Sequence, residues 1–278
     1  MAIDPFLVTH RSVLAIAVPM TIGYVTTPLV GVADMAVVGQ LGSAALLGGV
    51  ALGALVFDFL FTTCNFLRSG TTALVAQAFG RGDRREEAAV MARAVIAALV
   101  IGLLILAFQA PLIDTALAML APGAETEAAT RTYFDIRVLA APLTLLNYAV
   151  FGWLIGLGRA GTALALQILL NGANIALSIW FGLVLGHGIA GVAWGTVVAE
   201  AVALAGGGLI VVAVLGRAGA PTVAEVMDRA RLLAMFAVNR DIMIRSFVLL
   251  TAFFAFSAVS ARLGDVTLAA NAVLEKLW

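Results

Sequence analysis

Long apolar runs separated by short polar connectors make up most of the chain. A membrane-spanning helix needs about 20 predominantly apolar residues. Runs of that length cover residues 13–38, 44–67, 88–110, 133–157, 161–185, 189–215 and 242–261, and a further run begins near Val266. The pattern predicts an all-α polytopic membrane protein.

Composition and charge narrow the class further. The chain is 63% hydrophobic and 12% charged, with a mean hydropathy of +1.09, which is far from an ordinary soluble domain. The single cysteine, Cys64, cannot form an intrachain disulfide. His10 and His187 are isolated, and the sequence has no catalytic triad or HExxH pattern. We therefore expect no enzyme, cofactor, metal site or nucleic-acid partner.

Arginine is concentrated in alternate connectors. These residues are Arg11, Arg81, Arg84, Arg85, Arg159, Arg217, Arg229, Arg231 and Arg240. The intervening connectors, which include the expected loop Pro111–Thr130, contain only Arg262. The positive-inside rule therefore predicts a cytoplasmic N-terminus.

A weak internal repeat suggests two lobes. Val37, Leu41, Gly42, Leu46 and Leu52 recur at one offset as Val259, Leu263, Gly264, Leu268 and Leu274. Six spans per repeat would give both halves the same orientation, as in parallel-repeat transporters. We expect a six-helix N-terminal lobe over residues 1–215, a cytoplasmic connector over 216–241, and the beginning of a second lobe, cut short, over 242–278.

Asp34 is the only charged residue between Val13 and Val38. A carboxylate inside a spanning helix is costly, and such residues usually serve ions, protons or substrates. Gly23, Thr27 and Asp34 fall within about 40° of one another on a helix, so they predict a narrow polar edge.

Two later runs carry matching polar edges. One helical face of the fifth run holds Gln167, Asn171, Asn174 and Ser178, and one face of the sixth holds Thr196 and Glu200. A stripe of amides is not tolerated facing lipid, so these faces should meet other helices or a water-filled cavity. Together with Asp34 and Thr27, they predict a polar cavity inside the bundle that could bind substrate.

Each feature also has a structural interpretation. The amide stripe could join helices without a functional role, and neighbouring hydroxyls could hold Asp34. Asp58 and Glu200 could be hydrogen-bonded packing residues. Arg68, Asp135 and Arg137 lie near the ends of expected spans, where we expect them to reach the interface or pair locally.

Several spaced motifs resemble one family over essentially the whole chain. They are Val18-Pro19-Met20, Val32-Ala33-Asp34, Val38-Gly39-Gln40-Leu41-Gly42, Phe66-Leu67-Arg68-Ser69-Gly70-Thr71-Thr72, Gly152-Trp153-Leu154, Asn174-Ile175-Ala176-Leu177 and Gly191-Val192-Ala193-Trp194-Gly195-Thr196. The chain resembles the multidrug and toxic compound extrusion (MATE) family, in its DNA-damage-inducible F (DinF) branch. Members have twelve helices in two lobes, which agrees with the repeat.

The resemblance assigns roles to particular residues. It makes Asp34 the proton- or cation-responsive carboxylate, Pro19 the point at which the first helix bends, and Asn174 and Thr196 cavity residues. The sequence departs from many relatives at Ser178, where they carry a second acid. Hard cations prefer charged oxygen ligands, so this departure favours proton over sodium coupling.

The resulting expectation is a monomeric secondary transporter in a bacterial inner membrane. It would export lipophilic, often cationic organic compounds in exchange for protons. Two alternatives remain open: a lipid-linked precursor flippase of the same superfamily, and a membrane scaffold that transports nothing.

Overall fold

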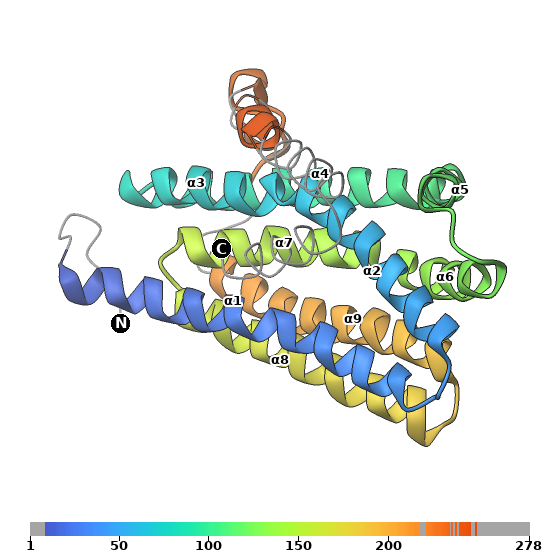
Figure 1. The fold of residues 1–278 in the computed structure, drawn as a ribbon. Helices are drawn as coiled ribbons and strands as arrows, with labels where there is room; N and C mark the ends of the chain where they lie inside the picture. The colour runs from blue at the N-terminus through green and yellow to red at the C-terminus, as the bar shows by residue number, and fades with distance from the viewer. Residues whose placement is uncertain are drawn as a thin grey trace.

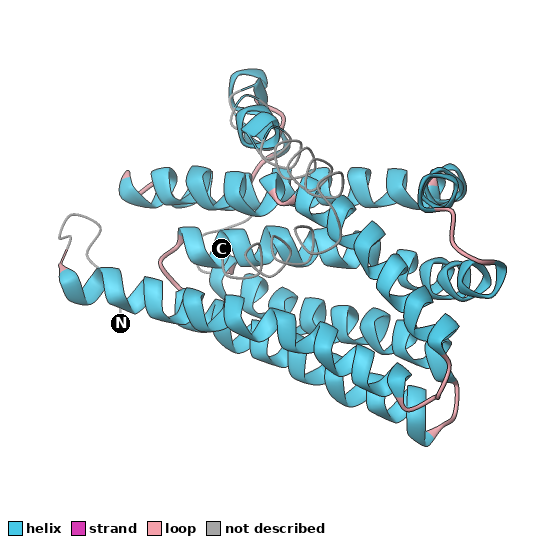
Figure 2. Ribbon diagram, in the orientation of Figure 1, coloured by secondary structure: helices cyan, strands magenta, loops and turns pink. Residues whose placement is uncertain are grey.

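A computed structural model of the chain describes residues 9–216, 221–233, 235, 237, 239–245 and 248. All regular secondary structure within these residues is helical (Figures 1 and 2). The elements are α1 (His10–Gly39), α2 (Ala44–Cys64), α3 (Phe66–Gly80), α4 (Arg84–Ala107), α5 (Gln109–Leu120), α6 (Ala124–Arg137), the 3₁₀ turn η1 (Val138–Ala140), α7 (Ala141–Gly156), α8 (Ala160–Ile179), the π-helical turn η2 (Trp180–Val184), α9 (Gly188–Leu215) and α10 (Val223–Val226).

Six helical stretches in the described part are long and apolar enough to cross a membrane. They are His10–Gly39, Ala44–Gly80, Arg84–Ala107, Ala124–Gly156, Ala160–Val184 and Gly188–Leu215. The six spans expected before residue 216 are therefore confirmed in number, and all but two agree closely in their bounds. The span expected over 242–261 and the repeat residues from Val259 onward lie outside the described residues, except for 242–245 and 248.

The second and fourth spans are longer than the sequence pattern predicted. Charged residues had set the expected ends, but the structure accommodates them. The helix continues past Arg68 as α3, with the guanidinium carbon 5.5 Å from the centre of the Phe151 ring. The expected loop Pro111–Thr130 is mostly helical, and Arg131 of α6 pairs with Glu127 at 3.2 Å and with Asp114 of α5 at 2.8 Å.

Side-chain caps fix where three helices begin. Thr9 Oγ1 accepts a hydrogen bond from the Ser12 amide at 3.2 Å, ahead of α1. Ser43 and Asp83 cap α2 and α4 in the same way, at 3.3 Å and 3.0 Å. Each cap satisfies a backbone donor that the first helical turn leaves without an intrahelical partner.

Helix α7 occupies the middle of the bundle (Figure 1). It packs against α3 and α4 on one side and against α9 on the other, while α1 lies along α8 and α8 along α9. Trp153 of α7 is fully buried and donates its indole N–H to the Glu87 carbonyl of α4 at 3.0 Å. The polar faces of α1, α8 and α9 are thereby brought to one side of α7.

Glycines allow α8 and α9 to touch through their backbones. A Cβ atom added at Gly195 of α9 would lie 2.7 Å from the backbone nitrogen of Ser178, closer than real Cβ atoms approach. At Gly191 it would lie 2.5 Å from the carbonyl of Phe181, in the turn η2 that follows α8. Because neither glycine has a side chain, the polar residues beside them can meet across the interface.

This packing predicts that Gly195→Ala lowers the free energy of unfolding by about 1–3 kcal/mol through overpacking. Gly208→Ala on the same helix is the matched control, because a Cβ there meets no atom within 4 Å. Thermal and denaturant unfolding of the full-length protein in detergent would measure both. Equal stability of the two variants would contradict the close α8–α9 contact.

Candidate functional site

Asp34 of α1 is buried inside the helical bundle, with 5% of its surface exposed. Its carboxyl lies beside the Ser178 hydroxyl of α8 and within electrostatic range of Arg137. Oδ1 has no hydrogen-bond partner among the residues that the structure describes. A buried carboxyl oxygen with spare acceptor capacity can take up a proton or coordinate a cation.

The polar stripe of α8 joins this helix to α1 and α9. The Asn171 amide donates to Thr26 Oγ1 of α1 at 2.9 Å, and the half-buried Gln167 donates to Asn171 Oδ1 at 3.0 Å. The Asn174 amide donates to Thr196 Oγ1 of α9 at 3.1 Å. All four polar positions on α8 thus face protein.

Asn174 also connects the stripe to the surroundings of Asp34. Its Oδ1 accepts a long hydrogen bond of 3.4 Å from Ser178, the residue beside the Asp34 carboxyl. Asp34, Ser178, Asn174 and Thr196 therefore form a continuous buried group from three helices. We refer to these four residues as the polar centre.

Two expected site residues on α1 lie outside the polar centre. Thr27 is exposed, and its hydroxyl donates to the Gly23 carbonyl of its own helix at 3.3 Å. The threonine that reaches α8 is Thr26, one position earlier. Pro19 lies within the helical course of α1, beside a cavity of about 20 Å³ that Gln167 also lines.

Glu200 of α9 is held by an amide that the sequence analysis did not single out. Asn147 of α7, which is buried, donates its Nδ2 to Glu200 Oε2 at 2.7 Å and to the Glu200 carbonyl at 3.0 Å. Thr144 lies close to the same carboxyl. Asn147 is an amide inside an apolar run, so the rule that selected Asn171 and Asn174 could have found it.

Arg137 was also missed, because it was expected near the end of a span. That expectation was wrong: α6 continues through η1 into α7, so Arg137 lies well inside the span Ala124–Gly156. Its Nη1 donates to the Tyr133 hydroxyl at 2.6 Å, and its guanidinium lies 4.9 Å from the centre of the Phe57 ring.

The charge of Arg137 reaches three carboxyls from different helices. Asp34 of α1, Asp58 of α2 and Glu200 of α9 all interact electrostatically with this guanidinium. Arg137 is half-buried, and a cation among acids lowers the cost of holding their charges in a low-dielectric surrounding. Arg137 thus lies within electrostatic range of both the polar centre and Glu200, the partner of Asn147.

Among the described residues, no group of three or more His, Cys, Asp and Glu side chains is arranged to hold a metal ion. The site instead combines amides, hydroxyls and single carboxyls. Such groups can donate and accept hydrogen bonds to a small molecule and exchange a proton.

Fold and site together define a multi-pass helical membrane protein with ionisable groups inside its bundle. The profile of the MatE family matches residues 19–180, more than half of the chain, and the chain therefore belongs to the MATE family. This family consists of transporters, not enzymes. The family expectation from the sequence motifs is confirmed.

Two curated relatives and a solved structure illustrate the similarity. DNA damage-inducible protein F of Escherichia coli (strain K12) is 37% identical over 270 residues, which are 97% of this chain and 59% of the relative. Multidrug export protein MepA of Staphylococcus haemolyticus (strain JCSC1435) is 24% identical over 195 residues, 69% of this chain and 43% of the relative. The outward-facing structure of a multidrug resistance MATE transporter of the MOP superfamily superposes with a TM-score of 0.84 at 23% identity, covering 100% of this chain and 60% of that one.

The chain thus spans about 60% of the length of the relatives that match it over nearly all of its residues. At 23% identity the structural match establishes the fold alone. The first relative agrees with the DinF branch indicated by the sequence motifs.

The geometry of α1 and α8 predicts different effects for two adjacent threonines. Thr26→Val removes the interhelical acceptor of Asn171, whereas Thr27→Val removes only a bond within α1. A double-mutant cycle of Thr26→Val with Asn171→Leu should give a coupling of about 0.6 kcal/mol in unfolding experiments. The same cycle with Thr27→Val should give none, and equal couplings would contradict the assignment.

Proposed function

We propose that the complete protein exports lipophilic, often cationic organic compounds in exchange for protons. The observation that carries this proposal is Asp34, a carboxyl buried against the amide stripe of α8 with one oxygen lacking a partner in the described part of the chain. MATE membership and the multidrug names of the MepA relative and the solved transporter support it.

The proposed organisation has two lobes. Residues 1–215 form the first lobe, 216–241 the connector, and 242–278 the beginning of the second lobe. The coverage of about 60% of a solved MATE chain supports this division. The arginine distribution supports a cytoplasmic N-terminus, and the bacterial relatives support placement in an inner membrane.

In the proposed mechanism, proton uptake cancels the charge of Asp34. The polar centre then loses an ionic interaction with Arg137, and α1 can repack against α8, with Pro19 as the point of bending. Repacking changes the cavity at the lobe interface and releases substrate outward. Substrate and proton cross in opposite directions.

The remaining site residues are proposed to line the cavity or shape it. Asn174 and Thr196 belong to the polar centre, and their amide and hydroxyl can bind substrate once the helices separate. Gln167, Asn171 and Glu200 line adjoining faces in this proposal. Thr27 is exposed on α1 and would meet the cavity from the side of the proposed second lobe.

The first test is efflux of a fluorescent lipophilic cation from vesicles that contain the full-length transporter. Asp34→Asn should abolish efflux driven by an imposed proton gradient, because the side chain can no longer exchange a proton. Asp114→Asn is the control, since this carboxylate lies exposed on α5. Retained proton-driven efflux in Asp34→Asn would overturn the coupling role.

In the same assay, Asn174→Ala should alter the substrate or proton response while membrane insertion remains intact. Lost insertion would favour the packing interpretation of the amide stripe. Absent efflux in both wild type and Asp34→Asn would favour a lipid-type substrate or a scaffold.

Ser178 provides a test of ion selectivity. A carboxylate at this position would stand beside Asp34 and supply a second charged oxygen ligand. Ser178→Asp should therefore raise sodium-driven efflux by about tenfold or more, whereas the uncharged Ser178→Asn should not. Equal sodium-driven efflux in the two variants would show that residue 178 does not determine which ion is coupled to transport.

A further inference from the structure

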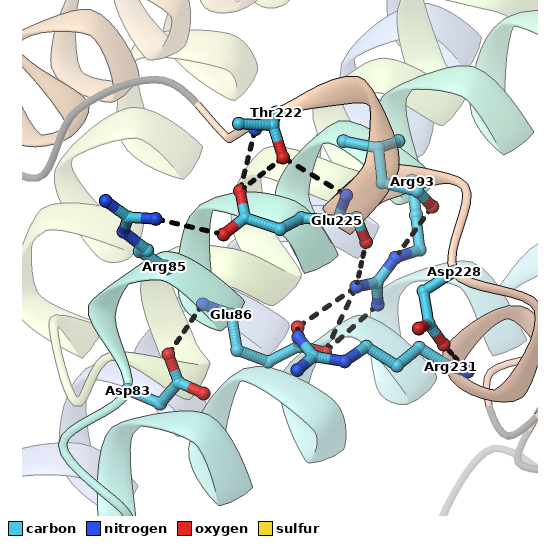
Figure 3. Close-up of polar contacts among 9 residues, drawn as sticks. Asp83, Arg85, Glu86, Arg93, Thr222, Glu225, Asp228 and Arg231 are labelled. Carbon is cyan, nitrogen blue, oxygen red and sulfur yellow. Dashed lines mark hydrogen bonds and ion pairs between the residues drawn. The ribbon is translucent and has the colours of Figure 1, made fainter.

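Arg93 of α4 ties the connector to the first lobe. This guanidinium is 2% exposed and binds the Glu86 carboxylate through Nη1 at 3.1 Å and Nη2 at 3.0 Å (Figure 3). Its Nε donates to the Val226 carbonyl at 3.2 Å, and Nη2 donates to the Glu225 carbonyl at 3.2 Å. One buried cation thus holds an acid on its own helix and two backbone carbonyls from a segment more than 130 residues away.

Glu86 receives a second cation from the connector. Arg231 donates to its Oε2, so the carboxylate lies between a buried guanidinium and a half-exposed one (Figure 3). The Glu86 carboxylate raises the pKa of Arg231, which keeps that partner charged. The backbone N–H of Arg231 is capped by Asp228 at 2.9 Å, so the local fold presents this side chain to Glu86.

The connector is preorganised to present its carbonyls. Thr222 and Glu225 form a capping box at the start of α10: the Thr222 amide donates to Glu225 Oε2 at 2.7 Å, and Thr222 Oγ1 accepts from the Glu225 amide at 3.3 Å. The hydrogen bond from the Thr222 amide stabilises the carboxylate form of Glu225 and so lowers its pKa. A single turn this short needs such a cap and external contacts to persist.

Apolar packing beneath the connector is incomplete. Val226 and Met235 of the connector are buried, but a cavity of about 210 Å³ remains between α4 and the connector, lined by Ile96, Val100, Met227 and Leu232 among others. The exposed ion pair of Arg85 and Glu225, at 3.4 Å with Arg85 76% exposed, contributes little in water. The hydrogen bonds and ion pairs of Arg93 and Glu86 are therefore the main polar contacts that hold the connector against α4.

We propose that residues 222–231 stay clasped to α4 throughout transport and move with the first lobe as one body. Arg93 is the positioning residue of this clasp, which consists of the contacts of Arg93 and Glu86 with residues 222–231. The inference rests on the proposed two-lobe organisation for its role in transport. The clasp itself is tested below without any transport measurement.

The first experiment is hydrogen exchange of the full-length transporter in nanodiscs. Arg93→Gln should speed exchange of the Val226 and Met227 amides by about tenfold or more, because Glu86 loses its buried partner and two carbonyls lose their donor. Arg93→Lys keeps the charge but not the planar fork, and should give a smaller increase. Arg85→Gln, the exposed control, should stay within about twofold of wild type.

Unchanged exchange of these amides in Arg93→Gln, with the remaining helices protected, would overturn the clasp. So would an equal acceleration in Arg85→Gln. This outcome is independent of whether the protein exports cations, so failure of the clasp and failure of the proposed function are distinguishable.

A second experiment covers the case in which Arg93→Gln does not fold. Cysteines replace Arg85 and the exposed Ala224, which precedes Glu225, the partner of Arg85, in a Cys64→Ala background, so that the capping box is kept. A bifunctional thiol reagent joins them. Efflux should continue after cross-linking, because the two positions stay together in every conformation. Efflux that stops with the bifunctional reagent but not with a monofunctional one would show that the connector must leave α4, and would overturn the proposal.

Discussion

Helices α8 and α9 approach so closely that a backbone nitrogen of one occupies the space a side chain would need on the other. This contact, permitted by Gly191 and Gly195, brings Asn174 within 3.1 Å of Thr196. In the hydrocarbon core of a membrane, no water is available to hydrogen-bond a polar side chain, so its partners must lie on neighbouring helices. The polar centre around Asp34 therefore depends on the absence of two side chains.

The same constraint explains the distribution of the buried polar groups. Asn147 satisfies Glu200 across α7 and α9, and Asn171 satisfies Thr26 across α8 and α1. Asp34 Oδ1 and Asn147 Oδ1 both lack a partner within the described residues. An amide oxygen does not take up a proton near neutral pH, whereas a carboxyl group does. Spare acceptor capacity on an ionisable group therefore separates the candidate coupling residue from the amides that join helices.

Two arginines have different roles in the bundle. Arg137 faces carboxyls from three helices and lies within electrostatic range of both Asp34 and Glu200. Arg93 uses hydrogen bonds to join an acid of α4 to the backbone of the connector. The first arrangement changes when a carboxyl gains a proton, while the second has no group that must change during transport. The polar centre is thus suited to respond to proton binding, and the clasp is suited to keep the connector on α4.

The sequence alone determined the number of spans before residue 216, the helical class and the family, because apolar length and spaced motifs are local properties of the chain. It also selected Asp34 and the stripe of α8, since an isolated polar residue in an apolar run can be recognised without knowing its neighbours. The tertiary structure decided that Thr26 and not Thr27 meets Asn171, that Arg137 lies inside a span, and that Arg93 holds the connector. These facts depend on helix rotation and on contacts between distant segments, which no local pattern fixes, because the partner that satisfies a buried charge lies on another helix.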